Sequence, residues 1–200
     1  MITVRRFWKL DQALRLLDFG PLLDWTESID PPASGDDFAE QAIYVICNSG
    51  MRYIVAGPIF ERCMVALRSG ASATTVYGHP GKSRAIDDIW RDRDDIFSGY
   101  QGADDKLAYC QALPWIGPVT KYHLVKNLGV DTAKPDVHLM RLAKRDKTTP
   151  LKLCQRLSKH TGRRIATVDT TLWLACAEGI LSSRRYEKKG WRAAFAGSAA

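Results

Sequence analysis

Apolar residues recur at helical spacing along nearly the whole chain, and no segment keeps the apolar-polar alternation of a half-buried strand. One apolar face runs through residues 38–47 and ends at Asn48-Ser49-Gly50. A second runs through residues 59–67 and stops at Ser69-Gly70, with Pro58 at its first turn or as a kink. The pattern predicts an all-α fold.

A third helix and two loops follow from the same pattern. We expect Ser83 to cap a helix that turns Ile86, Ile89 and Trp90 inward. Residues 29–35, rich in Pro, Ser and Gly, predict a turn between an N-terminal helix and a central bundle, and residues 71–81 predict a second loop.

The length of 200 residues suits one substantial core. We predict a single domain, 1–200, made of a central helical lobe at 36–130 and a terminal lobe that combines 1–35 with 131–200. The small-residue tail Ala196–Ala200 is expected to fray.

The composition excludes a membrane-spanning class. Hydrophobic residues make up 46% and charged residues 26%, the balance of a soluble globular protein. No run approaches the roughly 20 apolar residues that cross a bilayer, and charges interrupt the first residues too early for a secretory signal. We therefore expect a cytoplasmic, nucleoid-associated protein.

Cysteine and histidine spacing predicts neither a metal site nor a disulfide framework. The five cysteines are widely spaced and form no CxxC pair, so we expect buried thiols. No histidine is assigned to chemistry, and neither a metal nor a cofactor is expected; the four histidines are His79, His123, His138 and His160.

Positive charge is concentrated in the second half of the chain. The net charge is +7, but residues 101–200 carry +10 and residues 1–100 carry −3. A basic half suits a phosphate backbone, whose binding releases counterions. A solvated basic surface is an equally good interpretation of the charge alone.

The stretch from 113 to 143 carries the functional argument. A short helix that includes Leu107 and Ala108 cannot continue through Leu113-Pro114-Trp115-Ile116-Gly117, and helical spacing resumes over 119–128. This predicts helix, hairpin, helix. Because Gly117 permits a tight turn, unpaired amides at the start of the second helix are free to bind a phosphate.

These residues resemble a known motif. Hydrophobic-Pro-x-hydrophobic-Gly-x-x-Thr, then a helix, a short loop and Pro-Asp-Val-His-Leu, is similar to the signature of the helix-hairpin-helix GPD superfamily of DNA glycosylases, which have the endonuclease III-like fold. The resemblance is close over about thirty residues and looser over 42–63 and 165–179. It implies the two-lobed helix-hairpin-helix glycosylase fold and double-stranded DNA with a damaged or modified base as the partner of a monomer.

By this resemblance Asp136 is the catalytic carboxylate that stabilises the cationic sugar and positions the attacking water. The sequence adds a physical reason, because Lys134-Pro135-Asp136 introduces a helix whose dipole favours the charged carboxylate. The alternative is that Asp136 only caps its helix.

Two departures from the family pattern concern the hairpin. Val119 stands where bifunctional members carry the lysine that forms a Schiff base, and Lys121 is turned about 200° away on the helix, so we predict hydrolysis without a lyase step. Trp115 replaces the usual first glycine and either packs on a neighbouring helix or faces a sugar or unstacked base. The predicted DNA contacts are Trp115, Gly117, Val119, Thr120 and Lys121.

A base buried in duplex DNA must be extruded and its gap filled. Met51, Arg52 and Tyr53 are candidates for the residue that enters the duplex, against the alternative of an ordinary helix start. Trp173 and Asp169 are candidates for contact with the flipped base, against a core tryptophan and an N-cap aspartate. The predicted base pocket comprises Asn48, Tyr53, Asp169 and Trp173.

The prediction is therefore a monofunctional N-glycosylase that leaves an abasic site. It acts in base excision repair or, if the target is a hypermodified phage base, in antiphage defence. The alternatives are a non-catalytic helix-hairpin-helix DNA-binding protein and a bifunctional glycosylase/lyase that uses Lys121.

Overall fold

The computed structural model describes residues 1–195, and within that range the chain is helical and has no β-strand. An isolated antiparallel bridge pairs Leu181 with Phe195. The all-α prediction is confirmed, whereas the expected fraying of Ala196–Ala200 lies outside the described residues.

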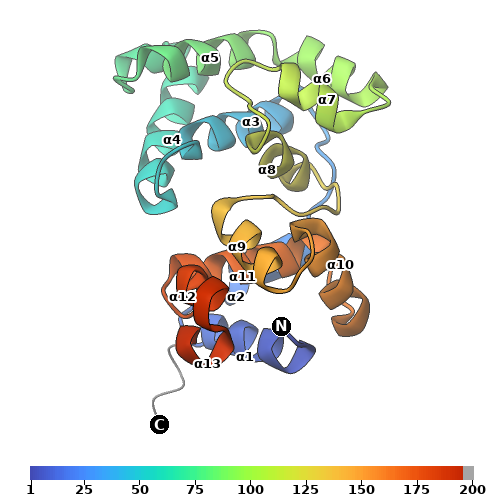
Figure 1. Ribbon diagram of the computed structural model, residues 1–200. Helices are drawn as coiled ribbons and strands as arrows, with labels where there is room; N and C mark the ends of the chain where they lie inside the picture. Colours follow the sequence, from blue (N-terminus) through green and yellow to red (C-terminus); the bar gives the residue numbers. More distant parts are fainter. Residues whose placement is uncertain (196–200) are drawn as a thin grey trace. The chain divides into compact units, whose positions relative to one another are not determined.

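The chain divides into two compact units (Figure 1). The central unit, Asp30–Gly129, contains α3 (Gly35–Asn48), α4 (Tyr53–Arg68), η1 (Ala73–Thr75), α5 (Pro80–Arg91), α6 (Arg93–Gly102), α7 (Lys106–Ala112) and α8 (Thr120–Asn127). The terminal unit joins Met1–Ile29 to the chain from Val130 onward and contains α1 (Val4–Arg15), α2 (Gly20–Glu27), α9 (Val137–Arg145), α10 (Pro150–Thr161), α11 (Ile165–Ala177), α12 (Ser183–Lys189) and α13 (Trp191–Ala194).

The core of the terminal unit surrounds α11. This helix packs against α1, α2, α9 and α10, and most of its residues are buried. A helix that is enclosed on most sides needs apolar residues around its circumference, which its sequence IATVDTTLWLACA largely supplies. The helices around it contribute Phe7, Leu10, Leu139, Leu142 and Leu153, all fully buried.

A buried carboxylate joins the first residues, α10 and α12 at the end of α9. The Asp146 side chain is 1% exposed. Its Oδ1 accepts the Tyr186 hydroxyl at 2.7 Å, and its Oδ2 accepts the Ile2 amide at 2.8 Å and Arg156 Nη2 at 3.4 Å. Because a buried carboxylate is tolerated only when it is hydrogen-bonded, this network holds segments far apart in the sequence together.

The core of the central unit surrounds α3, which packs against α4, α5, α6 and α8. The predicted apolar face of this helix is confirmed, since Phe38, Ala42, Ile43, Ile46 and Cys47 are fully buried. Ser34 caps α3 by accepting the Asp37 amide.

One local prediction was wrong, and another is narrowed to one of its two alternatives. Ser83 does not cap α5, because the helix begins at Pro80 and His79 accepts the Lys82 amide through Nδ1 at 3.3 Å, while the Ser83 hydroxyl donates back to the His79 carbonyl. Of the two placements expected for Pro58, the first turn is excluded because α4 begins at Tyr53, and the proline lies inside the helix, where a kink was the alternative.

The structure also bears on the cysteines and on the apolar segments of the chain. All five cysteines are buried thiols, as expected, and none of them forms a disulfide. None of the helices in residues 1–195 has the length and apolarity required to cross a bilayer.

Replacement of Asp146 by alanine should lower the free energy of unfolding by about 3 kcal/mol, because the Tyr186 hydroxyl and the Ile2 amide lose their acceptor inside the core. Tyr186→Phe, which removes one donor and leaves the carboxylate its other partners, should cost only about 1 kcal/mol. Urea unfolding measures both values. A loss no larger for Asp146→Ala than for Tyr186→Phe would contradict the network.

Candidate functional site

The predicted hairpin is a compact loop between α7 and α8. The Ile116 amide donates to the Leu113 carbonyl at 3.2 Å, and the Ile116 side chain is buried. The Gly117 amide donates to Thr120 Oγ1 at 2.7 Å, and the Lys121 amide donates to the Gly117 carbonyl at 3.0 Å. The hairpin is therefore held by its own hydrogen bonds, and Thr120 contributes through its hydroxyl.

Two amides at the start of α8 have no acceptor in the described part of the chain. They belong to Val119 and Thr120 and follow Pro118, which has no N–H. The Val119 side chain is 40% exposed, so this end of the helix is open to solvent. Unpaired amides at the positive end of a helix attract anions.

Trp115 fixes the hairpin to two other parts of the central unit. Its backbone has a φ of 63°, the left-handed region that a glycine occupies without strain. Its indole Nε1 donates to Ser49 Oγ at 3.1 Å. Its ring lies edge-on to the His79 ring at 5.2 Å and over Gly81, where an added Cβ would come within 2.6 Å of the ring. The indole therefore packs on neighbouring elements while remaining 44% exposed.

Ser49 is held on its other side by a buried lysine. Lys82 Nζ donates to the Ser49 carbonyl at 2.7 Å and to the Cys47 carbonyl at 3.2 Å. Burial lowers the pKa of Lys82. The turn after α3, in which Asn48 donates through its side chain to the Tyr44 carbonyl, is thus fixed from α3, α5 and the hairpin loop.

The residues predicted to enter the duplex follow this turn. Met51 is half-buried, Arg52 is exposed and immediately precedes α4, and Tyr53 is half-buried in its first turn. Two further apolar residues, Ile54 and Val55, are 51% and 48% exposed in the same turn and were not predicted from the sequence. Helical periodicity could not reveal them, because apolar residues on a helix are ordinarily assigned to the core.

Lys121 has a partner within the central unit. Its Nζ donates to Gln111 Oε1 at 2.6 Å and lies over the Tyr122 ring at 5.5 Å. The side chain therefore extends toward α7 rather than into the turn occupied by Val119.

Asp136 is the N-cap of α9 in the terminal unit. Its Oδ1 accepts the amides of His138 at 2.8 Å and Leu139 at 2.9 Å, as expected for a carboxylate before a helix. Its Oδ2 has no hydrogen-bond partner among residues 1–195, and the residue is half-buried. One oxygen thus fixes the side chain and leaves the other for a ligand.

Asp169 supports the loop that leads to Asp136. It is not an N-cap, contrary to one interpretation of the sequence, because it lies inside α11 and is 1% exposed. Its Oδ1 accepts the Lys134 amide at 3.1 Å. Trp173, on the same helix, is half-buried and packs against the core. Asp169 could contact a base directly only if the residues that bury its side chain moved away.

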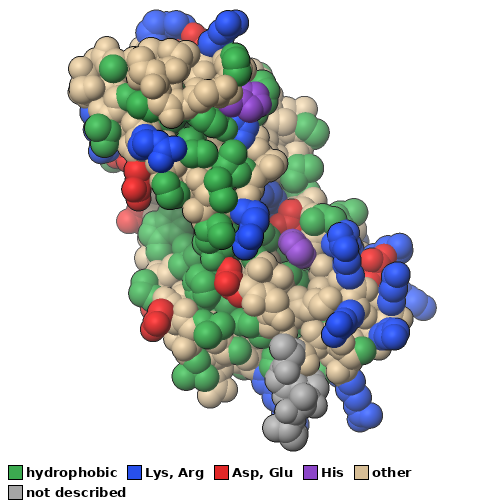
Figure 2. All heavy atoms as spheres, turned by 90° about the vertical axis from the view of Figure 1, so that its left-hand side faces the viewer, with side chains coloured by type: hydrophobic (Ala, Val, Ile, Leu, Met, Phe, Trp, Pro, Cys, Tyr) green, Lys and Arg blue, Asp and Glu red, His purple; other side chains and the backbone are tan. Residues whose placement is uncertain are grey.

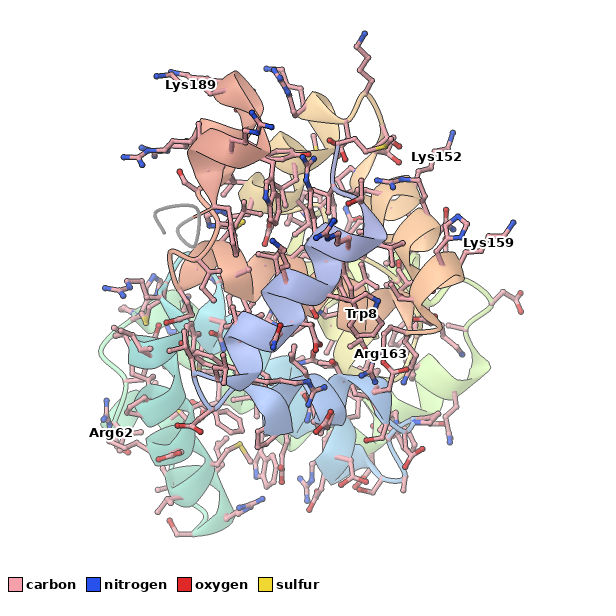
Figure 3. The ribbon with its side chains drawn as sticks, turned by 90° about the horizontal axis from the view of Figure 1, so that it is seen from below. Trp8, Arg62, Lys152, Lys159, Arg163 and Lys189 are labelled. Carbon is pink, nitrogen blue, oxygen red and sulfur yellow. The ribbon has the colours of Figure 1, made fainter. Side chains whose placement is uncertain are left out.

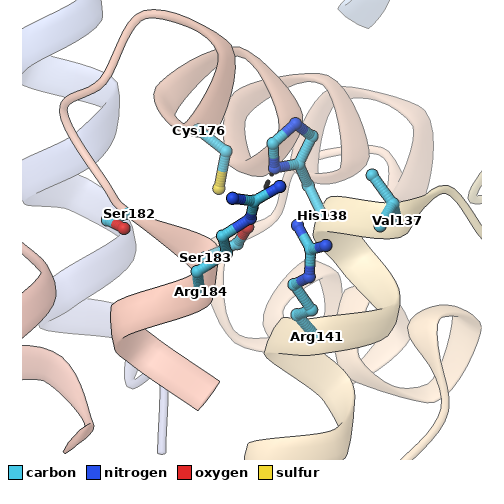
Figure 4. Close-up of a pocket in the computed structure, with 7 residues that line it drawn as sticks. All are labelled: Val137, His138, Arg141, Cys176, Ser182, Ser183 and Arg184. Atoms are coloured by element: carbon cyan, nitrogen blue, oxygen red, sulfur yellow. Dashed lines mark hydrogen bonds between the residues drawn. The ribbon is translucent and has the colours of Figure 1, made fainter. Parts of the chain in front are cut away.

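A pocket next to Asp136 contains side chains for which the sequence predicts no role. His138, Arg141 and Arg184 line it together with Ser183 (Figure 4). Burial lowers the pKa of His138, the Asp136 carboxylate raises it, and Arg141 and Arg184 lower it further. Their separation in sequence hid them, since α12 meets α9 only in the folded unit.

Charge divides between the units more sharply than between the halves of the sequence. The terminal unit carries 19 Lys and Arg against 10 Asp and Glu, and the central unit carries 10 against 12. Lys and Arg side chains gather on the terminal unit in Figure 2. Lys152, Lys159 and Lys189 extend outward in Figure 3, whereas Arg163 lies over the Trp8 ring. The hairpin therefore belongs to the less basic unit.

Comparison with known proteins identifies no relative. No family model matches the chain, no curated protein matches it, and no solved structure matches its fold. Within residues 1–195 no group of three or more His, Cys, Asp or Glu side chains could hold a metal ion.

Gly81→Ala should lower the free energy of unfolding by about 1–3 kcal/mol, because the added methyl group would overlap the Trp115 ring. Gly57→Ala is the matched control in the same unit. No atom lies within 4 Å of a Cβ at that helical position, so the change should stabilise by about 0.5–1 kcal/mol. Equal effects in thermal or urea unfolding would show that Trp115 does not pack on Gly81.

The pKa of His138 should lie below its ordinary value of 6.5, and Asp136→Asn should lower it further, because the carboxylate favours the imidazolium. A pH titration of the ring signals by NMR measures both values. An unchanged or higher midpoint in Asp136→Asn would place the carboxylate away from the ring.

Proposed function

We propose that this protein is a monofunctional DNA glycosylase of the helix-hairpin-helix GPD superfamily, with its two-lobed fold. The observation that carries the proposal is the state of Asp136, whose Oδ1 is held by two backbone amides while its Oδ2 has no partner among the described residues. A fixed carboxylate with one free oxygen suits the stabilisation of a cationic sugar. The residues around it resemble the family motif.

The hairpin supplies the second argument. The amides of Val119 and Thr120 are open to a phosphate, and phosphate contacts fix the register of a protein on a duplex without reading its sequence. Gly117 and Thr120 hold the loop that presents them.

The reaction is hydrolysis of the N-glycosidic bond. As the base departs with the bonding electron pair, positive charge develops on the sugar, and the Asp136 carboxylate stabilises it. Water then adds its oxygen to the sugar carbon and loses one proton through the carboxylate to solvent, while the departed base takes up one proton from solvent. The products are a free base and an abasic site.

The turn after α3 is proposed to enter the duplex and fill the gap. Arg52 is exposed there, with Met51 beside it and exposed Ile54 and Val55 in the first turn of α4. The fixed position of Ser49 supports this role, since a side chain that enters a base stack must be attached to a rigid part of the backbone. Asn48 and Tyr53 of the central unit are the proposed contacts to the extruded base.

A lyase step is not part of the proposal. Val119 cannot form a Schiff base, and the amine of Lys121 is engaged by Gln111.

Asp136→Asn separates an enzyme from a DNA-binding module. Asparagine is also a good N-cap, so α9 should persist, while release of bases from a panel of damaged and hypermodified duplexes should fall by at least about 100-fold. Mass spectrometry measures the released bases, and fluorescence anisotropy measures DNA binding, which should be retained. Asp18→Asn is the control, because Asp18 is exposed, lies in the same unit and has a φ of 63°, which asparagine tolerates.

Each contrary outcome has a distinct meaning. DNA binding by the natural chain with no base released from any duplex would favour the non-catalytic module. Undiminished release by Asp136→Asn would remove the carboxylate from the mechanism. A covalent adduct trapped by borohydride at Lys121 would show a bifunctional enzyme.

A further inference from the structure

A pocket of about 470 Å³ lies between α9 and the start of α12 in the terminal unit (Figure 4). Its lining residues include two arginines and no carboxylate, and they are Val137, His138, Arg141, Cys176, Ser182, Ser183 and Arg184. The volume is sufficient for a phosphate group with part of the sugar attached to it.

The two guanidinium groups come from different helices and lie beside the same imidazole ring in Figure 4. Arg184 is exposed and has no carboxylate partner in residues 1–195. Arg141 is 4.0 Å from Glu187 Oε2, but the nearer cation to that carboxylate is Lys144, at 2.7 Å from its Oε1. The Asp136 carboxylate precedes the pocket residue Val137. Burial raises the pKa of the Cys176 thiol and lowers that of His138, and the carboxylate raises both values, so it lies close enough to act on the pocket. Two arginines therefore converge on a pocket that no carboxylate lines.

The neutral groups of the pocket are fixed by hydrogen bonds. His138 Nδ1 and Ser183 Oγ are 2.9 Å apart, and Ser183 is buried. Ser182 Oγ accepts the Arg185 amide at 3.3 Å and caps α12. The site is thus built from ordered side chains rather than from flexible surface cations alone.

We propose that this pocket binds a phosphate group, which Arg141 and Arg184 hold through their guanidinium N–H donors. A planar guanidinium matches two phosphate oxygens at once, and two of them can share one phosphate. Since Val137 lines the pocket and Asp136 directly precedes it, a DNA phosphate bound here would lie close to the sugar on which Asp136 acts. Only this choice of DNA as the source rests on the proposed function.

The first test uses inorganic phosphate and the whole chain, at constant ionic strength maintained with chloride. NMR signals of the His138 ring and of Arg184 Nε should shift and saturate. Arg184→Gln should weaken binding by about 10-fold through the loss of a charged, bidentate donor. Arg185→Gln is the matched control, since Arg185 is exposed on the same helix and does not line the pocket; it should bind phosphate like the natural chain.

A second test identifies the source of the phosphate. Short duplexes with and without a 5′-terminal phosphate are compared for binding to the natural chain and to Arg184→Gln. An equal loss of affinity for both duplexes would assign the pocket to an internal phosphodiester, whereas a loss confined to the phosphorylated duplex would assign it to a terminal phosphate.

The proposal is overturned if phosphate causes no saturable shift, if chloride causes the same shift, or if Arg184→Gln and Arg185→Gln weaken binding equally. Failure of the proposed function is a separate result. A chain that releases no base but binds phosphate through Arg184 retains the phosphate site, and a chain that releases bases but ignores phosphate loses only this inference.

Discussion

The terminal unit depends on the burial of one carboxylate. Asp146 lies at the end of α9 and accepts hydrogen bonds from the Ile2 amide, Tyr186 and Arg156, so the first residues, α12 and α10 are joined at a single point. A buried charge with these partners is costly to disturb, because each partner would lose its acceptor away from water. These bonds hold α9 against α12, and the pocket that contains Arg141 and Arg184 lies between the two helices. Asp136 lies at the opposite end of α9 from Asp146.

In the central unit, a tryptophan and a buried lysine hold one turn in place. Trp115 occupies a backbone conformation that favours glycine, and its indole offsets this strain through the Ser49 hydroxyl and the space left by Gly81. Lys82 holds the same serine through its carbonyl. Two residues that are unusual in isolation, a tryptophan at positive φ and a buried lysine, thus fix one turn from opposite sides.

The distribution of charge gives the units different electrostatic character. The hairpin, with its unpaired amides, belongs to the unit of net charge −2, while the unit of Asp136 carries +9. Attraction of a polyanion would come mainly from the terminal unit, and the hairpin would contribute directed amide dipoles rather than net charge. Under the proposed function, long-range attraction and local positioning of the DNA would thus come from different units.

The sequence by itself determined the helical class, the buried faces of α3 and α5, the hairpin between α7 and α8 and the position of Asp136 before a helix. These are local properties, set by apolar spacing, by Pro and Gly and by capping chemistry within a few residues. Only the tertiary structure decided that Asp169 is buried beneath the loop at Lys134, that Trp115 packs on Gly81, and that Arg184 joins His138 and Arg141 in one pocket. Each of these contacts joins helices distant in sequence, and helical periodicity specifies which face of a helix is buried but not which helix covers it.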